Sequence, residues 1–244
     1  MKKVKVLHYD AFSSVVNAKV FYARTRNELM RSCYHRRIIC PKNPGAAGGQ
    51  NIFHIETNVG VLPVSFENKG EQILITMQQD APRFIPFEGD VQKLAESIGL
   101  AKEDLDLSKP IVYGSTGTWT LLIPIKELSK FKTMQPRNED FPQILAENPR
   151  SSVHPICFEA HDEKALMHAR HFSSPFSGTV EDPVTGTASG VMGAYYLKYI
   201  DDQLPMLEFA VEQGQEIGRD GRVWVRAVRN GAVWMFLYRE RECL

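Results

Sequence analysis

The chain has 244 residues, which is enough for one large domain or for two domains of ordinary size. It carries 29 basic and 29 acidic side chains and has a formal net charge of zero, so no long-range field attracts nucleic acid or an anionic membrane surface. We therefore expect a small-molecule or protein partner, with no nucleic acid and no membrane.

The sequence also limits the targeting segments and the cysteine chemistry that we expect. The N-terminal MKKVKVLHYDAF lacks the apolar run of a signal peptide, and no later stretch approaches the roughly 20 apolar residues of a membrane span. These features favour a cytoplasmic protein. The cysteines form no CxxC pair, which predicts free thiols instead of a disulfide framework or a zinc site. They are Cys33, Cys40, Cys157 and Cys243.

The first half of the chain has the pattern of several strands followed by one helix. Residues 3–8 alternate apolar and polar side chains and predict a first strand. From Asn51 onward, three runs rich in Ile, Val and Phe are separated by glycine turns, which predicts an antiparallel meander. Apolar residues at helical spacing predict a helix over 91–98 that ends at Gly99. The turn-rich DLSKP sequence that follows is a plausible domain boundary.

The second half has the pattern of a further α/β block. Residues 110–125 form two strand-like segments around a Gly-Ser-Thr-Gly turn, and residues 152–160 and 166–174 continue the strand pattern. Small residues open the segment 187–200, whose apolar positions predict a mostly buried helix. Residues 219–236 predict a late hairpin around an Asn-Gly turn.

Residues 23–49 fit neither the helical nor the strand period, and they crowd arginine, cysteine and histidine together. A basic arm that binds nucleic acid is one interpretation of this stretch. Its candidate arginines are too few for a binding footprint. They are Arg31, Arg36 and Arg37.

Two groups of residues could be considered as metal ligands. Cys33, His35 and Cys40 offer three ligands at irregular spacing with no second cluster, which makes a metal site there weak. His168 and His171 are three residues apart in a strand-like segment, so their side chains should point to opposite faces. We interpret both histidines as structural or cleft-edge residues and expect no metal site.

The sharpest local signal is GTVEDPVTGTASG, residues 178–190, which lies directly before the predicted buried helix. Small residues leave backbone N–H groups uncovered at a helix N-terminus, where the helix dipole favours an anion such as a carboxylate. Asp182 could then lie beside that anion as an acid/base or orienting group. The alternative is that Asp182 and Thr185 only cap a turn and the helix. A phosphate loop is disfavoured because no Gly-Lys-Ser/Thr follows.

EDPVTGTASG resembles the EDPxTGSA signature of the PhzF (phenazine biosynthesis-like) isomerase family, and HARHFSSPFSG before it is similar to the strand and turn of that family. The order of segments also matches from Gln50 to about Ala232. The resemblance implies an α/β fold of the α+β, diaminopimelate-epimerase type, with two similar domains at 1–107 and 108–244. Each is a curved, mostly antiparallel sheet around a central helix. The resemblance also implies a homodimer that moves a proton on a small carboxylated substrate without a metal or coenzyme.

The same resemblance assigns roles to individual residues. Asp182 matches the active-site aspartate of the family, and Thr187 supplies a hydroxyl where many relatives have serine. These two are predicted to be catalytic. The predicted substrate-binding residues are Thr185, Gly186 and Ala188.

The family pattern breaks in the N-terminal half, where residues 15–49 are aberrant. Members of the family carry GNP after the first strand, then a glutamate that is the main acid/base, and then YFTP and CGHAT motifs. None of these is present, because DAFSS continues directly into VVNAKVFYARTR. The segment that would hold the glutamate is therefore interpreted as deleted, and the N-terminal domain as incomplete.

Two slips of reading frame are a hypothesis for the remaining departures. Codons can be chosen for residues 20–48 so that the frame one nucleotide later reads YFTPGHEMNLCGHATIAASYALKTRGLLE, which contains both missing motifs in order. Residues 233–243 can similarly be back-translated to VDVSISGTGV, an alternating strand, two nucleotides later. We expect irregular packing over 15–49 and impaired catalysis. The alternatives are a non-catalytic domain that binds a small carboxylate or a protein, and a chain that does not fold stably.

Overall fold

The computed structural model describes residues 51–57, 60–69, 72–229 and 233–240, and every structural statement below concerns these residues. The strand predicted over 3–8 and the aberrant residues 15–49 lie outside the described part of the chain.

One sheet of eleven strands forms the scaffold, in the order β1-β2-β3-β11-β10-β9-β8-β7-β6-β5-β4. Neighbouring strands are antiparallel except for the parallel pairs β6/β7 and β8/β9. The predicted meander is confirmed as β1–β3, and the late hairpin as β10–β11. The strands are β1 (Asn51–Thr57), β2 (Gly60–Lys69), β3 (Gln72–Gln78), β4 (Arg83–Pro86), β5 (Val112–Ser115), β6 (Trp119–Pro124), β7 (Ser152–Cys157), β8 (Ala165–Ala169), β9 (Met206–Gln213), β10 (Gly221–Val228) and β11 (Val233–Glu240).

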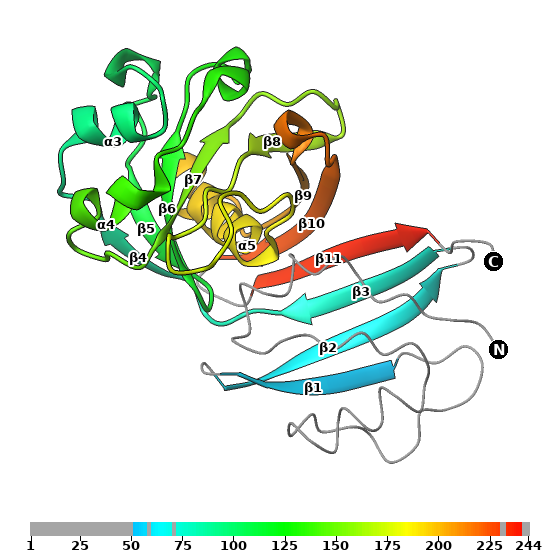
Figure 1. The fold of residues 1–244 in the computed structure, drawn as a ribbon. Helices are drawn as coiled ribbons and strands as arrows, with labels where there is room; N and C mark the ends of the chain where they lie inside the picture. The colour runs from blue at the N-terminus through cyan, green and yellow to red at the C-terminus, as the bar shows by residue number, and fades with distance from the viewer. Residues whose placement is uncertain (1–50, 58–59, 70–71, 230–232, 241–244) are drawn as a thin grey trace.

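The sheet curls around a single helix, α5, and the predicted α+β fold class is confirmed (Figure 1). Strands β4 to β11 surround α5, and β3, β2 and β1 continue the sheet beyond β11 as a flatter ribbon. The helices are α3 (Val91–Ser97), α4 (Phe141–Ile144) and α5 (Gly186–Tyr195), and α5 continues as a π-helical turn over Tyr196–Ile200. Short 3₁₀ turns lie at Lys102–Asp104, Leu128–Thr133, Asn138–Asp140 and Gln215–Ile217.

Helix α5 is buried along its whole length, as its composition predicted. Its small residues let the surrounding strands approach closely. A Cβ added at Gly193 would lie 2.9 Å from Val225 Cγ1 on β10, and one at Gly114 on β5 would lie 2.2 Å from Val191 Cγ1 on the helix. Tyr195 is fully buried, and its hydroxyl donates to the carbonyl of Pro110 at 2.9 Å. The helix is therefore the centre of the core.

Strands β5 to β7 are covered on both faces, and alternation along them supplies two cores. On β6, Leu122 packs with the α5 core, whereas Leu121 and Ile123 face the second core on the outer side. That second core includes Phe131 and Phe141 from the segments outside the sheet. Since side chains alternate with a period of two, fully buried strands such as β6 are apolar on both faces.

Helix α3 belongs to the outer layer. The Asp90 carboxylate caps it by accepting the N–H groups of Gln92 and Lys93, and Gly99 follows its end with a φ of 77°. Although α3 and β4 precede residue 107, β4 pairs with β5 and α3 packs in the outer core. The domain division at residues 107 and 108 remains a prediction. In the described part of the chain, no helix has the length and apolarity needed to cross a bilayer.

Candidate functional site

The loop that precedes α5 pairs with the residues that directly follow β8. The N–H group of Asp182 donates to the carbonyl of His171 at 3.0 Å, and Glu181 forms an isolated β-bridge with Phe172. This pairing places Asp182 on the α5 side of the sheet. The five predicted site residues therefore lie together, in the segment 182–188 that enters the helix.

Asp182 is 7% exposed and organises a tight turn. Its Oδ2 accepts the hydroxyl of Thr185 at 2.7 Å, and its Oδ1 accepts a long bond of 3.4 Å from the N–H group of Val184. Thr185 is the N-cap residue of α5 by backbone position, but its side chain does not cap the helix. Asp182 therefore does cap a turn, and the Thr185 side chain does not cap the helix; neither contact decides whether Asp182 has a further role.

The remaining predicted residues form the first turn of α5. Thr187 is 3% exposed and its carbonyl accepts the hydroxyl of Thr116 at 3.1 Å, while Ala188 is 1% exposed. Gly186 and Ala188 bring no bulky side chain to the end of the helix. Such a turn presents N–H groups and the positive end of the helix dipole to a ligand.

Two glutamines that the sequence analysis missed hold this loop. Gln213 on β9 donates from Nε2 to the carbonyl of Asp182 at 2.5 Å and to Thr185 Oγ1 at 3.2 Å, and its Oε1 accepts the N–H group of Thr185 at 3.3 Å. Gln79, after β3, donates to the carbonyl of Gly186 at 2.9 Å. Both glutamines are buried. The sequence could not predict these two contacts, because the glutamines come close to the loop only when the chain is folded.

A buried ion pair fixes the residue before Asp182. The Arg170 guanidinium binds both oxygens of the Glu181 carboxylate at 2.8 and 2.6 Å, and it also donates to the carbonyls of Phe131 and Met134. A bidentate arginine–carboxylate pair of this kind is the strongest form of such an interaction. The loop is therefore clamped on the outer face of the sheet by Arg170 and on the inner face by Gln213.

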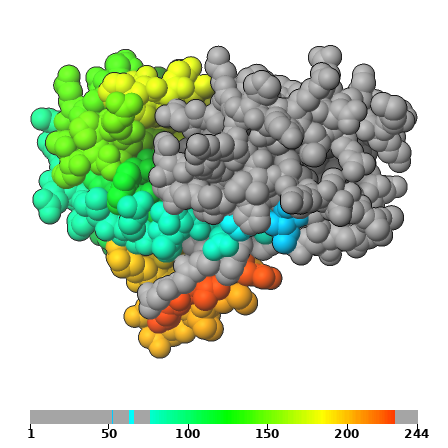
Figure 2. Space-filling model, turned by 90° about the horizontal axis from the view of Figure 1, so that it is seen from below, coloured from blue at the N-terminus to red at the C-terminus, as the bar shows by residue number. Residues whose placement is uncertain are grey.

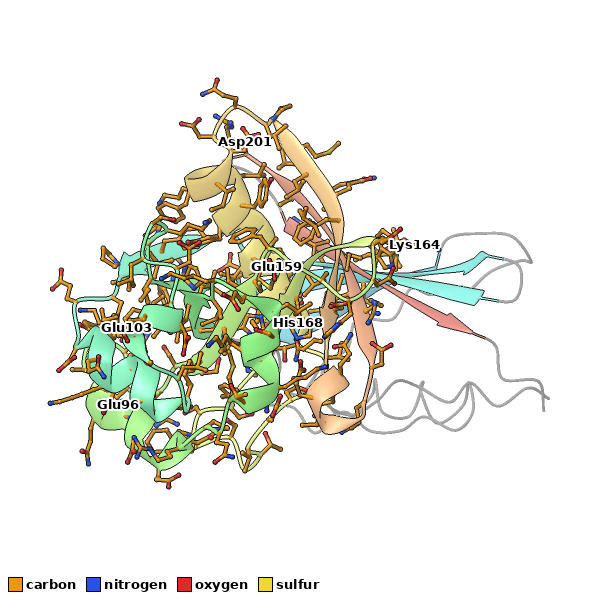
Figure 3. The ribbon with its side chains drawn as sticks, turned by 90° about the horizontal axis from the view of Figure 1, so that it is seen from above. Glu96, Glu103, Glu159, Lys164, His168 and Asp201 are labelled. Atoms are coloured by element: carbon orange, nitrogen blue, oxygen red, sulfur yellow. The ribbon has the colours of Figure 1, made fainter. Side chains whose placement is uncertain are left out.

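His168 and His171 point to opposite faces of the sheet, as predicted. The His171 Nδ1 lies 3.1 Å from the Nδ1 of His154, next to α5, whereas the His168 ring contacts Glu212 and Phe131 on the outer side (Figure 3). Burial lowers the pKa of His171 to about 3. Burial, followed by the neighbouring His171 and His168, also holds the pKa of His154 well below its usual value. The inner pair is therefore neutral at physiological pH.

A pocket of about 480 Å³ lies at the other end of α5, away from the Asp182 loop. It lies between the β4 region and the segments that follow α5, which are teal and amber to orange in Figure 2. None of the predicted site residues lines it. Its lining residues are Ala81, Pro82, Phe84, Ala194, Leu197, Lys198, Asp202, Val228 and Arg229.

Comparison with known proteins identifies relatives over most of the chain. The family model described as phenazine biosynthesis-like protein matches residues 37–233. The uncharacterized isomerase YfhB of Bacillus subtilis is 46% identical over 204 residues, which cover 82% of this chain and 68% of that protein. The trans-2,3-dihydro-3-hydroxyanthranilate isomerase of Pseudomonas aeruginosa is 28% identical over 189 residues, covering 75% of this chain and 61% of that protein.

Solved structures agree with this result. The crystal structure of a Bacillus anthracis PhzF-family phenazine biosynthesis protein matches with a TM-score of 0.72 and 48% identity, covering 78% of this chain and 66% of that one. A predicted epimerase from Pseudomonas aeruginosa has the same fold, with a TM-score of 0.64 at 21% identity, covering 82% of this chain and 69% of that one. The matched part of the chain thus covers between 61% and 69% of the length of these four proteins.

Proposed function

The chain belongs to the PhzF, or phenazine biosynthesis-like, family of isomerases, and we propose that its Asp182 loop is one half of an active site that transfers a proton on a small carboxylated substrate. The observation that carries the proposal is that the first turn of α5, which the Thr185 side chain does not cap, lies directly after a fixed aspartate.

The helix start supports binding of a carboxylate. The N–H groups of Gly186, Thr187 and Ala188 belong to the first turn of α5, which has no intrahelical acceptors for them. A carboxylate placed there gains charge-assisted hydrogen bonds and the favourable field of the helix dipole. The printed name of one relative, a hydroxyanthranilate isomerase, supports a small acid as substrate.

Asp182 is the acid/base of this half-site. Its turn fixes the carboxylate at the helix entrance, and proton transfer requires such a group to be within hydrogen-bond reach of the reacting carbon or its neighbour. The hydroxyl of Thr185 donates to Oδ2 and so stabilises the ionised form that accepts a proton. Thr187 supplies a second hydroxyl in the same turn.

A second acid/base must act from the opposite face of the substrate, and this chain lacks the glutamate that the family pattern places in the N-terminal half. We therefore propose that the chain as written is catalytically impaired. The family match ends at residue 233, where the second frame slip is placed, but it begins at residue 37, within the stretch assigned to the first slip. The remaining family expectations are also part of the proposal: a homodimer, a cytoplasmic location, no metal or coenzyme in the reaction, and a role in the biosynthesis of phenazine-like compounds.

A second candidate function is non-catalytic binding of a small carboxylate through the same loop. The first turn of α5 favours it, because its N–H groups belong to the helix and do not depend on the missing glutamate.

Exchange of substrate protons with deuterated water tests both functions. The comparison is between the chain as written and a repaired chain, with both frames closed and the deleted segment restored, over a panel of small carboxylates. We expect exchange only with the repaired chain. In that chain Asp182→Ala should lower turnover about 10²–10⁴-fold, while Asp202→Ala, at an exposed position, should not.

Each outcome separates the candidates. Robust exchange by the chain as written would refute impairment, and an unchanged rate for Asp182→Ala would refute the role of Asp182. Saturable carboxylate binding without exchange, in both chains, would favour the non-catalytic function.

A further inference from the structure

A second cluster of charged side chains lies on the outer face of the sheet, away from α5. His168 extends from β8 and Glu212 from β9, while Glu216 lies in the 3₁₀ turn that follows β9. His161 lies in the loop between β7 and β8. Figure 3 shows His168 in the interior and Lys164, at the end of the same loop, near the periphery. The cluster therefore joins a surface loop to the sheet.

The Glu212 carboxylate fixes the orientation of His168. The Glu212 side chain is fully buried, and its carboxylate accepts the N–H groups of His161 and Asp162 at 2.6 and 3.1 Å. The His168 Nδ1 lies 2.8 Å from the same carboxylate, and Arg222 lies 3.4 Å from its other oxygen. An ionised carboxylate only accepts hydrogen bonds, so His168 carries a hydrogen on Nδ1.

The opposite ring nitrogen then meets a second carboxylate. His168 Nε2 lies 2.9 Å from Glu216 Oε1. A neutral ring with its hydrogen on Nδ1 presents a lone pair at Nε2, and a lone pair facing an ionised oxygen at this distance is repulsive. The contact is therefore satisfied either by a hydrogen bond, with a proton on one of the two atoms, or by a metal ion that binds both.

Two further observations favour a metal ion. The Glu216 side chain is only 4% exposed, and its Oε2 is buried without a hydrogen-bond partner among the described residues. The His161 ring packs edge-on against His168 with centroids 5.3 Å apart, and one ligand atom from each of His161, His168 and Glu216 lies within 4.8 Å of the others. Ligands about 2.1 Å from a tetrahedral zinc ion are about 3.4 Å apart, so a small movement closes the set. His161 is exposed on a loop and can make it.

We propose that His161, His168 and Glu216 bind a divalent ion of the zinc type, with Glu212 as the outer carboxylate that orients His168. Two imidazoles and one carboxylate are a ligand set that zinc accepts with a fourth position for water. A carboxylate on the far nitrogen of a ligand histidine is the usual support of such sites. The ion would tie the 158–164 loop to the turn after β9. Its location on the outer face makes it independent of the proposed isomerase site.

Metal titration of the full chain, purified without an affinity tag and stripped with a chelator, tests the proposal. Calorimetry with ZnCl₂ should show one ion bound per chain, and Co²⁺ should give a tetrahedral visible spectrum without thiolate charge-transfer bands. His161→Ala and Glu216→Gln should each weaken binding at least 10-fold, and Glu212→Gln should weaken it about 10–100-fold. Glu163→Gln, an exposed acid in the same loop, is the matched control and should bind as the unchanged chain does.

A double substitution tests whether the cysteines act as metal ligands. Cys33→Ser with Cys40→Ser should leave the stoichiometry and affinity unchanged. Zinc should also raise the midpoint of thermal unfolding of the unchanged chain but not of His161→Ala, whose exposed position keeps the fold intact. Absence of saturable binding, or equal affinity in folded His161→Ala and Glu216→Gln, would overturn the proposal and leave a proton as the species between His168 and Glu216.

Discussion

Acidification should destabilise the fold through the inner histidine pair before most carboxylates titrate. The pKa of His171 is about 3 in the folded chain and 6.5 in the unfolded chain. Between these values the unfolded state binds more protons, so the stabilising contribution is complete above pH 6.5 and is lost as the pH falls. From pH 7.5 to 5.0 the free energy of unfolding should decrease by about 2 kcal/mol from His171 alone, at about 1.4 kcal/mol per pH unit below 6.5. His154 adds to this in the same direction.

The substitution His171→Asn removes the titration of residue 171 while keeping its hydrogen bond to His154. The Nε2 of His154 lies 3.2 Å from Met192 Sδ, and a thioether has no hydrogen to donate, so Nε2 is the donor. The Nδ1 of His154 must then accept from His171, across 3.1 Å. The amide group of an asparagine can donate in the same place but does not titrate.

Urea unfolding followed by tryptophan fluorescence measures the difference at several pH values between 7.5 and 5.0. The unchanged chain should lose about 2 kcal/mol more than His171→Asn over this range. Because His171 itself contributes to the lowered pKa of His154, the difference between the two chains includes the change at His154. Equal losses in the two chains would show that His171 is not held neutral by burial, and would refute the reasoning.

Three substitutions test the contacts that hold the loop and helix, each by urea unfolding at pH 7.5. Gln213→Leu should lower the free energy of unfolding by about 2–4 kcal/mol, because it leaves a buried carbonyl and N–H group of the loop unpaired. Arg170→Met should cost about 3–5 kcal/mol by leaving the Glu181 carboxylate buried alone, and Glu181→Leu in the same chain should recover most of the loss. Gly190→Ala should cost about 1–3 kcal/mol, since the new Cβ would lie 2.1 Å from Gln79 Oε1 and displace a side chain that is hydrogen-bonded to the start of α5. Undiminished stability in any of them would contradict the contact concerned.

The parts of the fold that the sequence predicts are those encoded by neighbouring residues. The helix over 91–98 follows from apolar spacing and a glycine stop, and α5 follows from small residues followed by apolar ones. Period-two alternation correctly separates His168 from His171. The resemblance to a family motif then locates the Asp182 loop, whose residue roles stay predictions.

The contacts between distant segments could not be predicted. Gln79 and the carbonyl of Gly186 are 107 residues apart, and His168 and Glu212 are 44 residues apart. A lone glutamine or glutamate has no spacing or composition that marks it as a partner of such a residue. For the same reason His161 was not connected to His168 in the sequence, although their rings are in contact in the fold.

Alternation along the chain also explains how the Asp182 loop is held from both faces of the sheet. Glu181 faces the outer side, where Arg170 binds it, and the next residue, Asp182, faces α5. His171 likewise follows Arg170, and its carbonyl accepts the N–H group of Asp182. Gln213 closes the loop from β9. Arg170, Gln213 and the His171 carbonyl thus hold the Asp182 turn from the C-terminal part of the chain, so we expect that restoring the N-terminal segment leaves these contacts unchanged.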